Sequence, residues 1–167
     1  LENGSDHEYI LFANGALKDV KFEFKDQLKS SNVSYFIWYS PCPLDYRKEF
    51  KPKFTLAKYL RSYALSNLNI DVLIITSFLE GFNDNCLTEI DHDSFKGRVV
   101  TIFYDLIPLL NSHLYLKSNP QFASFYQSKL KSLKKLDGLL AISDSSATEV
   151  TKYLKFSPEK VFNISSA

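Results

Sequence analysis

The sequence predicts an α/β fold with a mostly parallel sheet and helices on both faces. Short apolar runs alternate along the chain with longer segments of helical spacing, which is the order typical of parallel sheets. Residues 99–103 (Val-Val-Thr-Ile-Phe) are rich in β-branched side chains and lack polar alternation. Such a run indicates a strand buried on both faces. With 167 residues, 45% of them hydrophobic, the chain is most simply one domain with a sizeable core.

The first 76 residues contain three predicted strands and two predicted helices. The strands are residues 9–13, residues 33–39 and residues 71–76, and the third is expected to be buried because it lacks polar alternation. Pro41 and Pro43 end the second strand, since proline cannot continue a central strand. Apolar residues at helical spacing mark the two helices: Leu17, Val20, Phe24 and Leu28 in the first, and Phe54, Ala57, Leu60, Ala64 and Leu68 in the second, which Pro52 opens.

The rest of the chain continues the alternation after a loop at residues 77–85. Ser146 and Glu149 form a predicted capping box for a helix that runs to Lys155. The other predicted elements are strands at residues 99–103, 138–142 and 161–164 and a long helix at residues 120–136, whose inner face carries Phe122, Phe125, Tyr126, Leu130 and Leu133.

Composition excludes several classes of protein. Charge is nearly balanced, with 20 basic and 19 acidic residues, so nothing demands nucleic acid or an anionic membrane as partner. No run approaches the ~20 apolar residues of a membrane span. Glycine-rich phosphate-binding motifs are absent, and the three histidines lie far apart without ligand spacing, so no metal site is expected. Cys42 and Cys86 are expected to be free buried thiols in a reducing compartment, with a disulfide as the lesser alternative.

Polar residues collect where the predicted strands end. In an open α/β sheet these ends converge on one crevice, where ligands bind. We therefore expect Glu80, Tyr104, Asp105 and Ser143 to line a common crevice. The alternative is that Ser143 and Ser145 help to cap the next helix while Asp105 holds a turn through backbone N–H groups. The full set of strand-end residues is Thr76, Ser77, Glu80, Tyr104, Asp105, Ser143, Asp144 and Ser145.

A basic flank lies on the long predicted helix. Such a charge run is usually a solvated face, and contact with anionic lipid headgroups is a weaker alternative. The flank comprises Lys129, Lys131, Lys134 and Lys135.

Four segments of the chain resemble, in sequence order, segments of the N-terminal domain of family 4 glycosyltransferases. The resemblance is strongest to the mannosyltransferase-like branch found in O-antigen and capsule gene clusters. The resemblance implies one half of a GT-B architecture, in which two Rossmann-like domains face each other across a cleft. The N-terminal domain receives the acceptor and the C-terminal domain holds the nucleotide-sugar. The segments are Ser77-Phe78-Leu79-Glu80-Gly81-Phe82, Tyr104-Asp105-Leu106-Ile107-Pro108-Leu109, Leu140-Ala141-Ile142-Ser143-Asp144-Ser145-Ser146 and Ser157-Pro158-Glu159-Lys160-Val161.

The same resemblance implies roles for individual residues. Asp105 and Tyr104 are the implied catalytic residues. Many members have histidine where this chain has Tyr104, and tyrosine donates a hydrogen bond but is a poor base near neutral pH, so a positioning role is the expectation for Tyr104. No metal and no other cofactor is implied. The implied substrate-binding residues are Glu80, Gly81, Phe82, Ser143 and Ser145.

The resemblance also implies partners and missing parts. Residues 1–167 would be one Rossmann-like acceptor-side domain, a fragment. Leu1 to Gly4 resemble the last turn of a helix, and the family's opening strand, normally central in the sheet, would precede them. The C-terminal nucleotide-sugar domain would follow. Partners would be a nucleotide-sugar, a glycan or lipid-linked acceptor and that C-terminal domain, in the cytoplasm or peripherally at the inner face of the membrane.

Two other functions stay open at this stage. One is a non-catalytic module that derives from a transferase domain and binds a glycan or a protein. The replacement of histidine by Tyr104 favours it slightly, whereas Asp105, Glu80, Gly81 and the segment around Ser143 favour the transferase. The other is a flavodoxin-like domain of unrelated function, although the chain has no phosphate-binding loop to support it.

Overall fold

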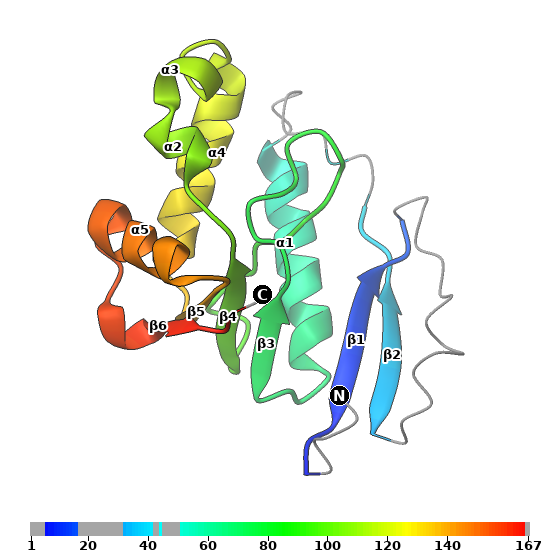
Figure 1. The fold of residues 1–167 in the computed structure, drawn as a ribbon. Helices are drawn as coiled ribbons and strands as arrows, with labels where there is room; N and C mark the ends of the chain where they lie inside the picture. Colours follow the sequence, from blue (N-terminus) through cyan, green and yellow to red (C-terminus); the bar gives the residue numbers. More distant parts are fainter. Residues whose placement is uncertain (1–5, 17–31, 42–43, 45–50, 166–167) are drawn as a thin grey trace.

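The computed structural model describes residues 6–16, 32–41, 44 and 51–165 (Figure 1). Every strand pairing in this part of the chain is parallel, and the strands fall into two sheets of order β1-β2 and β3-β4-β5-β6. The predicted α/β class with a parallel sheet is therefore confirmed. The strands are β1 (Tyr9–Asn14), β2 (Val33–Trp38), β3 (Val72–Ile75), β4 (Arg98–Phe103), β5 (Gly138–Ala141) and β6 (Val161–Asn163).

Helices alternate with these strands as the sequence predicts. The predicted helix with Leu17 to Leu28 on its apolar face lies outside the described residues. Between β4 and the long helix, two single turns of helix form that the sequence does not predict. The helices are α1 (Lys51–Ser66), α2 (Ile107–Leu110), α3 (Ser112–Tyr115), α4 (Pro120–Leu133), α5 (Asp144–Leu154) and the 3₁₀ turn η3 (Pro158–Lys160). None of the helices in this part of the chain is both long and apolar enough to cross a membrane.

The sheet is divided between β1 and β3. The strands of both sheets point the same way, and β1 is the member of the smaller sheet nearer to β3 (Figure 1). Phe12 of β1 packs against the main core, and the Arg61 guanidinium of α1 lies 5.7 Å from the centre of the Phe12 ring. Within the described residues no strand pairs with the facing edges of β1 and β3.

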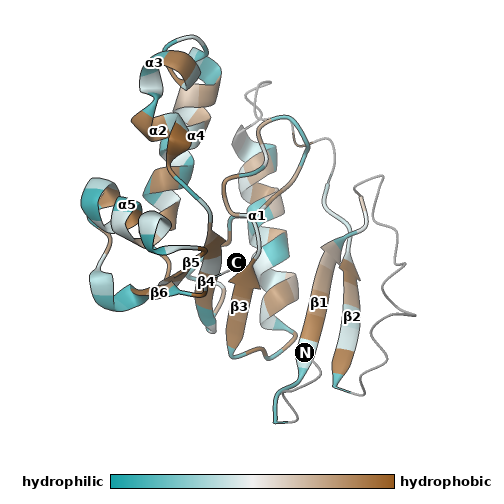
Figure 2. Cartoon of the chain, viewed as in Figure 1, coloured by the Kyte–Doolittle hydropathy of each residue, from teal (hydrophilic) through white to brown (hydrophobic). Residues whose placement is uncertain are grey.

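The two faces of the larger sheet differ in burial. Leu73, Val99 and Phe103 project to the face where α1, α4 and α5 complete the main core. Val72 and Ile74 project to the other face and are 49% and 52% exposed, although β3 is apolar along its length (Figure 2). The prediction that residues 71–76 form a buried strand is therefore wrong at Val72 and Ile74, because the described helices cover only the opposite face of the sheet. In residues 99–103, predicted to be buried on both faces, Val100 and Ile102 are only partly buried.

The start of α5 also differs from its prediction. Ser143, not Ser146, is the N-cap, and its side-chain oxygen accepts from the Ser146 N–H at 3.1 Å. The predicted capping box of Ser146 and Glu149 is wrong because both side chains bond to the segment after β4. The Ser146 hydroxyl donates to the Tyr104 carbonyl, and a Glu149 carboxylate oxygen accepts from the Leu106 N–H at 3.3 Å.

Candidate functional site

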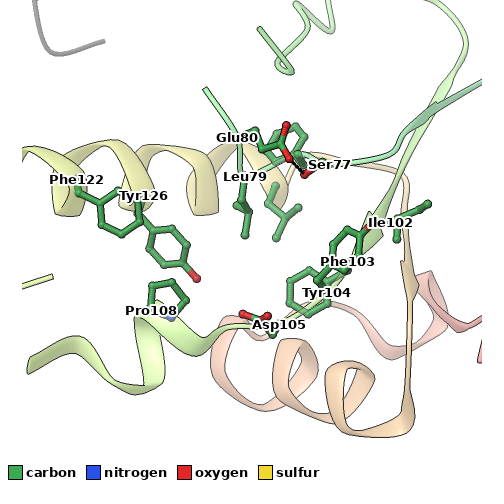
Figure 3. Close-up of a pocket in the computed structure, with 12 residues that line it drawn as sticks. Ser77, Leu79, Glu80, Ile102, Phe103, Tyr104, Asp105, Pro108, Phe122 and Tyr126 are labelled. Carbon is green, nitrogen blue, oxygen red and sulfur yellow. Dashed lines mark hydrogen bonds between the residues drawn. The ribbon is translucent and has the colours of Figure 1, made fainter. Parts of the chain in front are cut away.

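A pocket of about 290 Å³ opens where β3 and β4 end (Figure 3). Its walls come from the loop after β3, the last residues of β4, the turn into α2, and α4. This is the edge of the sheet where the sequence predicts ligand binding. The pocket is lined by Ser77, Phe78, Leu79, Glu80, Ile102, Phe103, Tyr104, Asp105, Pro108, Phe122, Tyr126 and Leu133.

Asp105 is held in place by the turn that leads into α2. One carboxylate oxygen, Oδ1, accepts from the Ile107 N–H at 2.9 Å, so Asp105 does hold a turn as the alternative interpretation expects. Within the described part of the chain, Oδ2 accepts no hydrogen bond. Asp105 is half-buried and lines the pocket. The turn therefore fixes one oxygen and leaves the other for a ligand.

Tyr104 is positioned through its backbone. Its carbonyl accepts from the Ser146 hydroxyl, and the Ser146 oxygen lies 3.1 Å from the Ser143 oxygen. These contacts tie the end of β4 to the start of α5. The Tyr104 side chain lines the pocket and is half exposed, so a ligand in the pocket can reach it.

Glu80 reaches the pocket from the loop after β3. The Ser77 hydroxyl donates to Glu80 Oε1 at 2.7 Å, and both residues line the pocket (Figure 3). A serine at the first loop position and a glutamate three residues later thus form a brace, which here means a side-chain hydrogen bond within the loop. The brace directs the exposed carboxylate of Glu80 along the pocket wall.

Gly81 and Phe82 shape this loop instead of lining the pocket. Gly81 has φ +110°, and a Cβ there would lie 2.4 Å from the Cys86 carbonyl oxygen. Such a contact is impossible, so the close approach requires glycine. The Phe82 ring packs on α4, 5.2 Å from the Phe122 ring centre. Cys86 is a free, half-buried thiol, and burial and then Asp84 raise its pKa, whereas Cys42 lies outside the described residues.

Two buried cations hold the far end of the same loop. Lys129 of α4 is 1% exposed, and its ammonium donates to the Thr88 hydroxyl at 2.7 Å. Burial lowers the pKa of Lys129, and Glu89, whose carboxylate is 3.8 Å away, offsets part of that effect. Arg61 of α1 donates to the Thr88 and Glu89 carbonyls, both at 3.2 Å, and burial lowers its pKa to about 10.

The interpretation of Lys129 as part of a solvated basic flank is therefore wrong. Lys131, Lys134 and Lys135 are exposed as that interpretation expects. Residues 122, 126, 129 and 133 follow helical spacing, which places Lys129 on the apolar inner face of α4. This spacing is the signal from which the burial of Lys129 could have been predicted. The ammonium is tolerated there because it also lies 5.4 Å and 5.3 Å from the ring centres of Phe78 and Phe125.

The predicted common crevice forms only in part. Glu80, Tyr104 and Asp105 line one pocket, but Ser143 does not, because its hydroxyl is turned toward the backbone of α5. Ser145 lies in the first turn of α5 and lines a separate pocket of about 340 Å³ with Asp144 and Lys152 among its walls. Within the described residues, no group of three His, Cys, Asp or Glu side chains is arranged to hold a metal ion.

The chain has close relatives among known proteins. Three relatives carry the same name, serotype-specific mannosyltransferase WbdA, and all three are from Escherichia coli. They are 34%, 34% and 33% identical to this chain, and each match covers all of it. The chain spans about a fifth of the length of these relatives. No family model and no solved structure matches.

Identity of this level along the whole chain indicates common descent. The parallel α/β fold and the placement of Tyr104 and Asp105 at a strand end agree with it. Along its whole length the chain is therefore similar to part of these mannosyltransferases, in agreement with its resemblance to that branch of the glycosyltransferases.

Proposed function

We propose that this chain is the acceptor-binding domain of a retaining glycosyltransferase that moves a sugar from a nucleotide-sugar to a glycan or lipid-linked acceptor. The observation that carries the proposal is that Asp105, with only one of its carboxylate oxygens bonded within the described residues, lines an open pocket beside Tyr104 and Glu80. The relatives named as mannosyltransferases support transfer of mannose as the reaction.

Asp105 would orient the acceptor. Its Oδ2 would accept a hydrogen bond from the acceptor hydroxyl that attacks the donor sugar, and a charge-assisted bond of this kind fixes direction as well as position. Oδ1 stays on the Ile107 N–H, so the carboxylate cannot rotate freely. Tyr104 would position the sugar with its hydroxyl rather than remove a proton.

The donor would be held mainly by a second domain of the same protein, the C-terminal domain that the resemblance implies. No metal or cofactor takes part in this proposal. The isolated chain should then neither transfer sugar nor hydrolyse a nucleotide-sugar. Turnover of GDP-mannose by the purified chain would contradict this division of labour.

The test is kinetic and uses the full-length protein that carries this chain. Asp105→Asn should lower turnover roughly ten- to a thousand-fold, the scale of one lost charged positioning contact. Folding should survive because asparagine can still accept from the Ile107 N–H. Asp93→Asn, at an exposed loop position outside the pocket, is the matched control and should keep wild-type turnover.

A non-catalytic module that binds a glycan or a protein is the second candidate. Tyr104 favours it, since this half-exposed tyrosine stands where many family members carry histidine. Absence of turnover in the full-length wild-type protein would support this candidate. Wild-type turnover in Asp105→Asn, with unfolding unchanged, would instead leave Asp105 as a turn residue of an enzyme. Tyr104→Phe should cost little if the ring only packs, and about as much as Asp105→Asn if its hydroxyl contacts the acceptor.

We further propose that the protein works in the cytoplasm, peripherally at the inner face of the membrane when its acceptor is lipid-linked. Lys131, Lys134 and Lys135 are exposed close together in the chain and could meet anionic headgroups. Replacing all three by glutamine should reduce co-sedimentation with vesicles of phosphatidylglycerol. Equal co-sedimentation would leave these lysines a solvated face.

A further inference from the structure

The Tyr126 hydroxyl is a buried polar group without a partner. Tyr126 is 2% exposed, and within the described residues its hydroxyl makes no hydrogen bond. The side chain projects from α4 into the pocket, and its oxygen points toward the space between Pro108 and Asp105 (Figure 3). Buried hydroxyls are normally paired, so an unpaired one directed into a pocket marks a place where a ligand atom can complete the bond.

No backbone group among the described residues takes over this role. The Leu109 N–H is near enough to lower the phenol pKa, but it donates to the Leu106 carbonyl at 2.9 Å and is not placed to bond with the phenol. Burial, followed by the charge of Asp105, more than offsets that effect and raises the pKa of Tyr126. The phenol therefore keeps its proton at neutral pH and acts as a hydrogen-bond donor.

The charges of the pocket define what it can accept. Its charged lining residues are two carboxylates, Glu80 and Asp105, and the lining contains no lysine, arginine or histidine. A phosphate or a uronate would therefore enter a negative field with no cation to pair with. A neutral polyol meets no such penalty, because its hydroxyls can donate to the carboxylates and accept from a phenol.

The remaining walls fit a sugar ring. Tyr104, Phe122 and Pro108 contribute apolar surface on which the C–H face of a pyranose can lie. The volume, about 290 Å³, is at the lower end of small-molecule pockets, which start at about 300 Å³. It suits one sugar unit, not several.

We propose that this pocket binds one uncharged pyranose unit of the acceptor, with the Tyr126 hydroxyl donating to one sugar oxygen and Asp105 accepting from another sugar hydroxyl, and that it rejects anionic sugars. The assignment of this unit to the acceptor rests on the proposed function. The selectivity and the part of Tyr126 do not, since they follow from the lining of the pocket alone.

Binding to the full-length protein tests the proposal, with methyl α-mannopyranoside and mannose 6-phosphate as probes and NMR titration as the measurement. Tyr126→Phe removes only the hydroxyl, and Tyr115→Phe, at a 45% exposed position outside the pocket, is the matched control. Tyr126→Phe should weaken binding of the neutral probe roughly 3- to 10-fold, the value of one net hydrogen bond. Tyr115→Phe should bind as the wild type does, and mannose 6-phosphate should bind at least about 10-fold more weakly than the neutral probe.

The thermal midpoint of unfolding separates binding from a structural role. Tyr126→Phe should leave it unchanged or raise it, because the hydroxyl has no partner to lose. Equal affinity of Tyr126→Phe and wild type, equal affinity for the two probes, or no binding of the neutral probe would overturn the proposal. Tyr126-dependent binding in a protein that transfers no sugar would instead refute the proposed enzyme and leave this inference standing.

Discussion

The Lys129 ammonium donates to the Thr88 hydroxyl at 2.7 Å, and that hydroxyl donates in turn to the Phe78 carbonyl at 2.6 Å. This buried chain joins α4 to both ends of the loop after β3. Because the loop carries Glu80, α4 determines where one carboxylate of the pocket lies. The helix also supplies Tyr126, so the two sides of the pocket are fixed to the same element.

Lys129 should stabilise the protein through its stem more than through its charge. Lys129→Met preserves the volume of the side chain. The Thr88 hydroxyl still donates to the Phe78 carbonyl, and the Glu89 carboxylate still accepts from the Ser132 hydroxyl at 2.8 Å. We expect Lys129→Met to cost less than about 1.5 kcal/mol of unfolding free energy and Lys129→Ala, which leaves a cavity, about 2–4 kcal/mol. Urea unfolding measures both. Equal losses would mean that the ammonium, not the stem, is what matters.

Gly81 should not tolerate a side chain. Gly81→Ala places Cβ 2.4 Å from the Cys86 carbonyl at a positive φ, and we expect it to cost about 2–4 kcal/mol because backbone must move. Gly138→Ala is the matched control, since its Cβ would meet neighbours at 3.4 Å, and it should change stability by less than about 1 kcal/mol. Chemical denaturation of the two variants gives the comparison. A mild effect at Gly81 would show that the loop can shift.

Ser143 and Ser145 should differ although they are two residues apart. Ser143→Ala removes the N-cap of α5 and should cost about 1 kcal/mol. Ser145 is exposed, so Ser145→Ala should change the unfolding free energy by no more than about 0.5 kcal/mol. Thermal unfolding distinguishes the two. If Ser143→Ala lowered activity more than its loss of unfolding free energy explains, Ser143 would again be a candidate site residue.

The sequence predicts the elements well because side-chain spacing reports directly on local structure. The apolar run at residues 99–103 lies in β4, and the helical spacing from Phe122 to Leu133 lies in α4. It does not predict the division between β1 and β3, since an apolar strand looks the same whether or not a neighbour pairs with it. Val72 and Ile74 are half exposed because the described helices do not cover their face of the sheet.

The candidate site is predictable to the level of strand ends and no further. Glu80, Tyr104 and Asp105 meet because parallel strands end at one edge of a sheet. Whether a side chain then turns to a pocket or to a backbone depends on the next few dihedral angles, and Ser143 turns to the backbone. Tyr126 is missed because residues on an inner helix face are assumed to serve packing alone. Lys129 is missed because a group of lysines on one helix usually marks a solvated face.

Tyr126 should make the protein less stable at alkaline pH. Burial and the Asp105 charge raise its pKa in the folded protein above the ordinary value of 10.0. Above that pH the unfolded chain releases the phenol proton while the folded chain retains it, so the folded state binds more protons. The free energy of unfolding then falls as pH rises, by at most about 1.4 kcal/mol per pH unit for one group.

Urea unfolding of wild type and Tyr126→Phe from pH 8 to pH 11 measures this effect. The difference in unfolding free energy between the two should stay constant below about pH 9 and should then shift against the wild type as pH passes 10. Tyr115→Phe controls for the loss of a phenol at an exposed position. Parallel curves for wild type and Tyr126→Phe across the whole range would mean that the phenol ionises as readily in the folded protein as in the unfolded chain. The hydroxyl would then be solvated rather than buried beside Asp105.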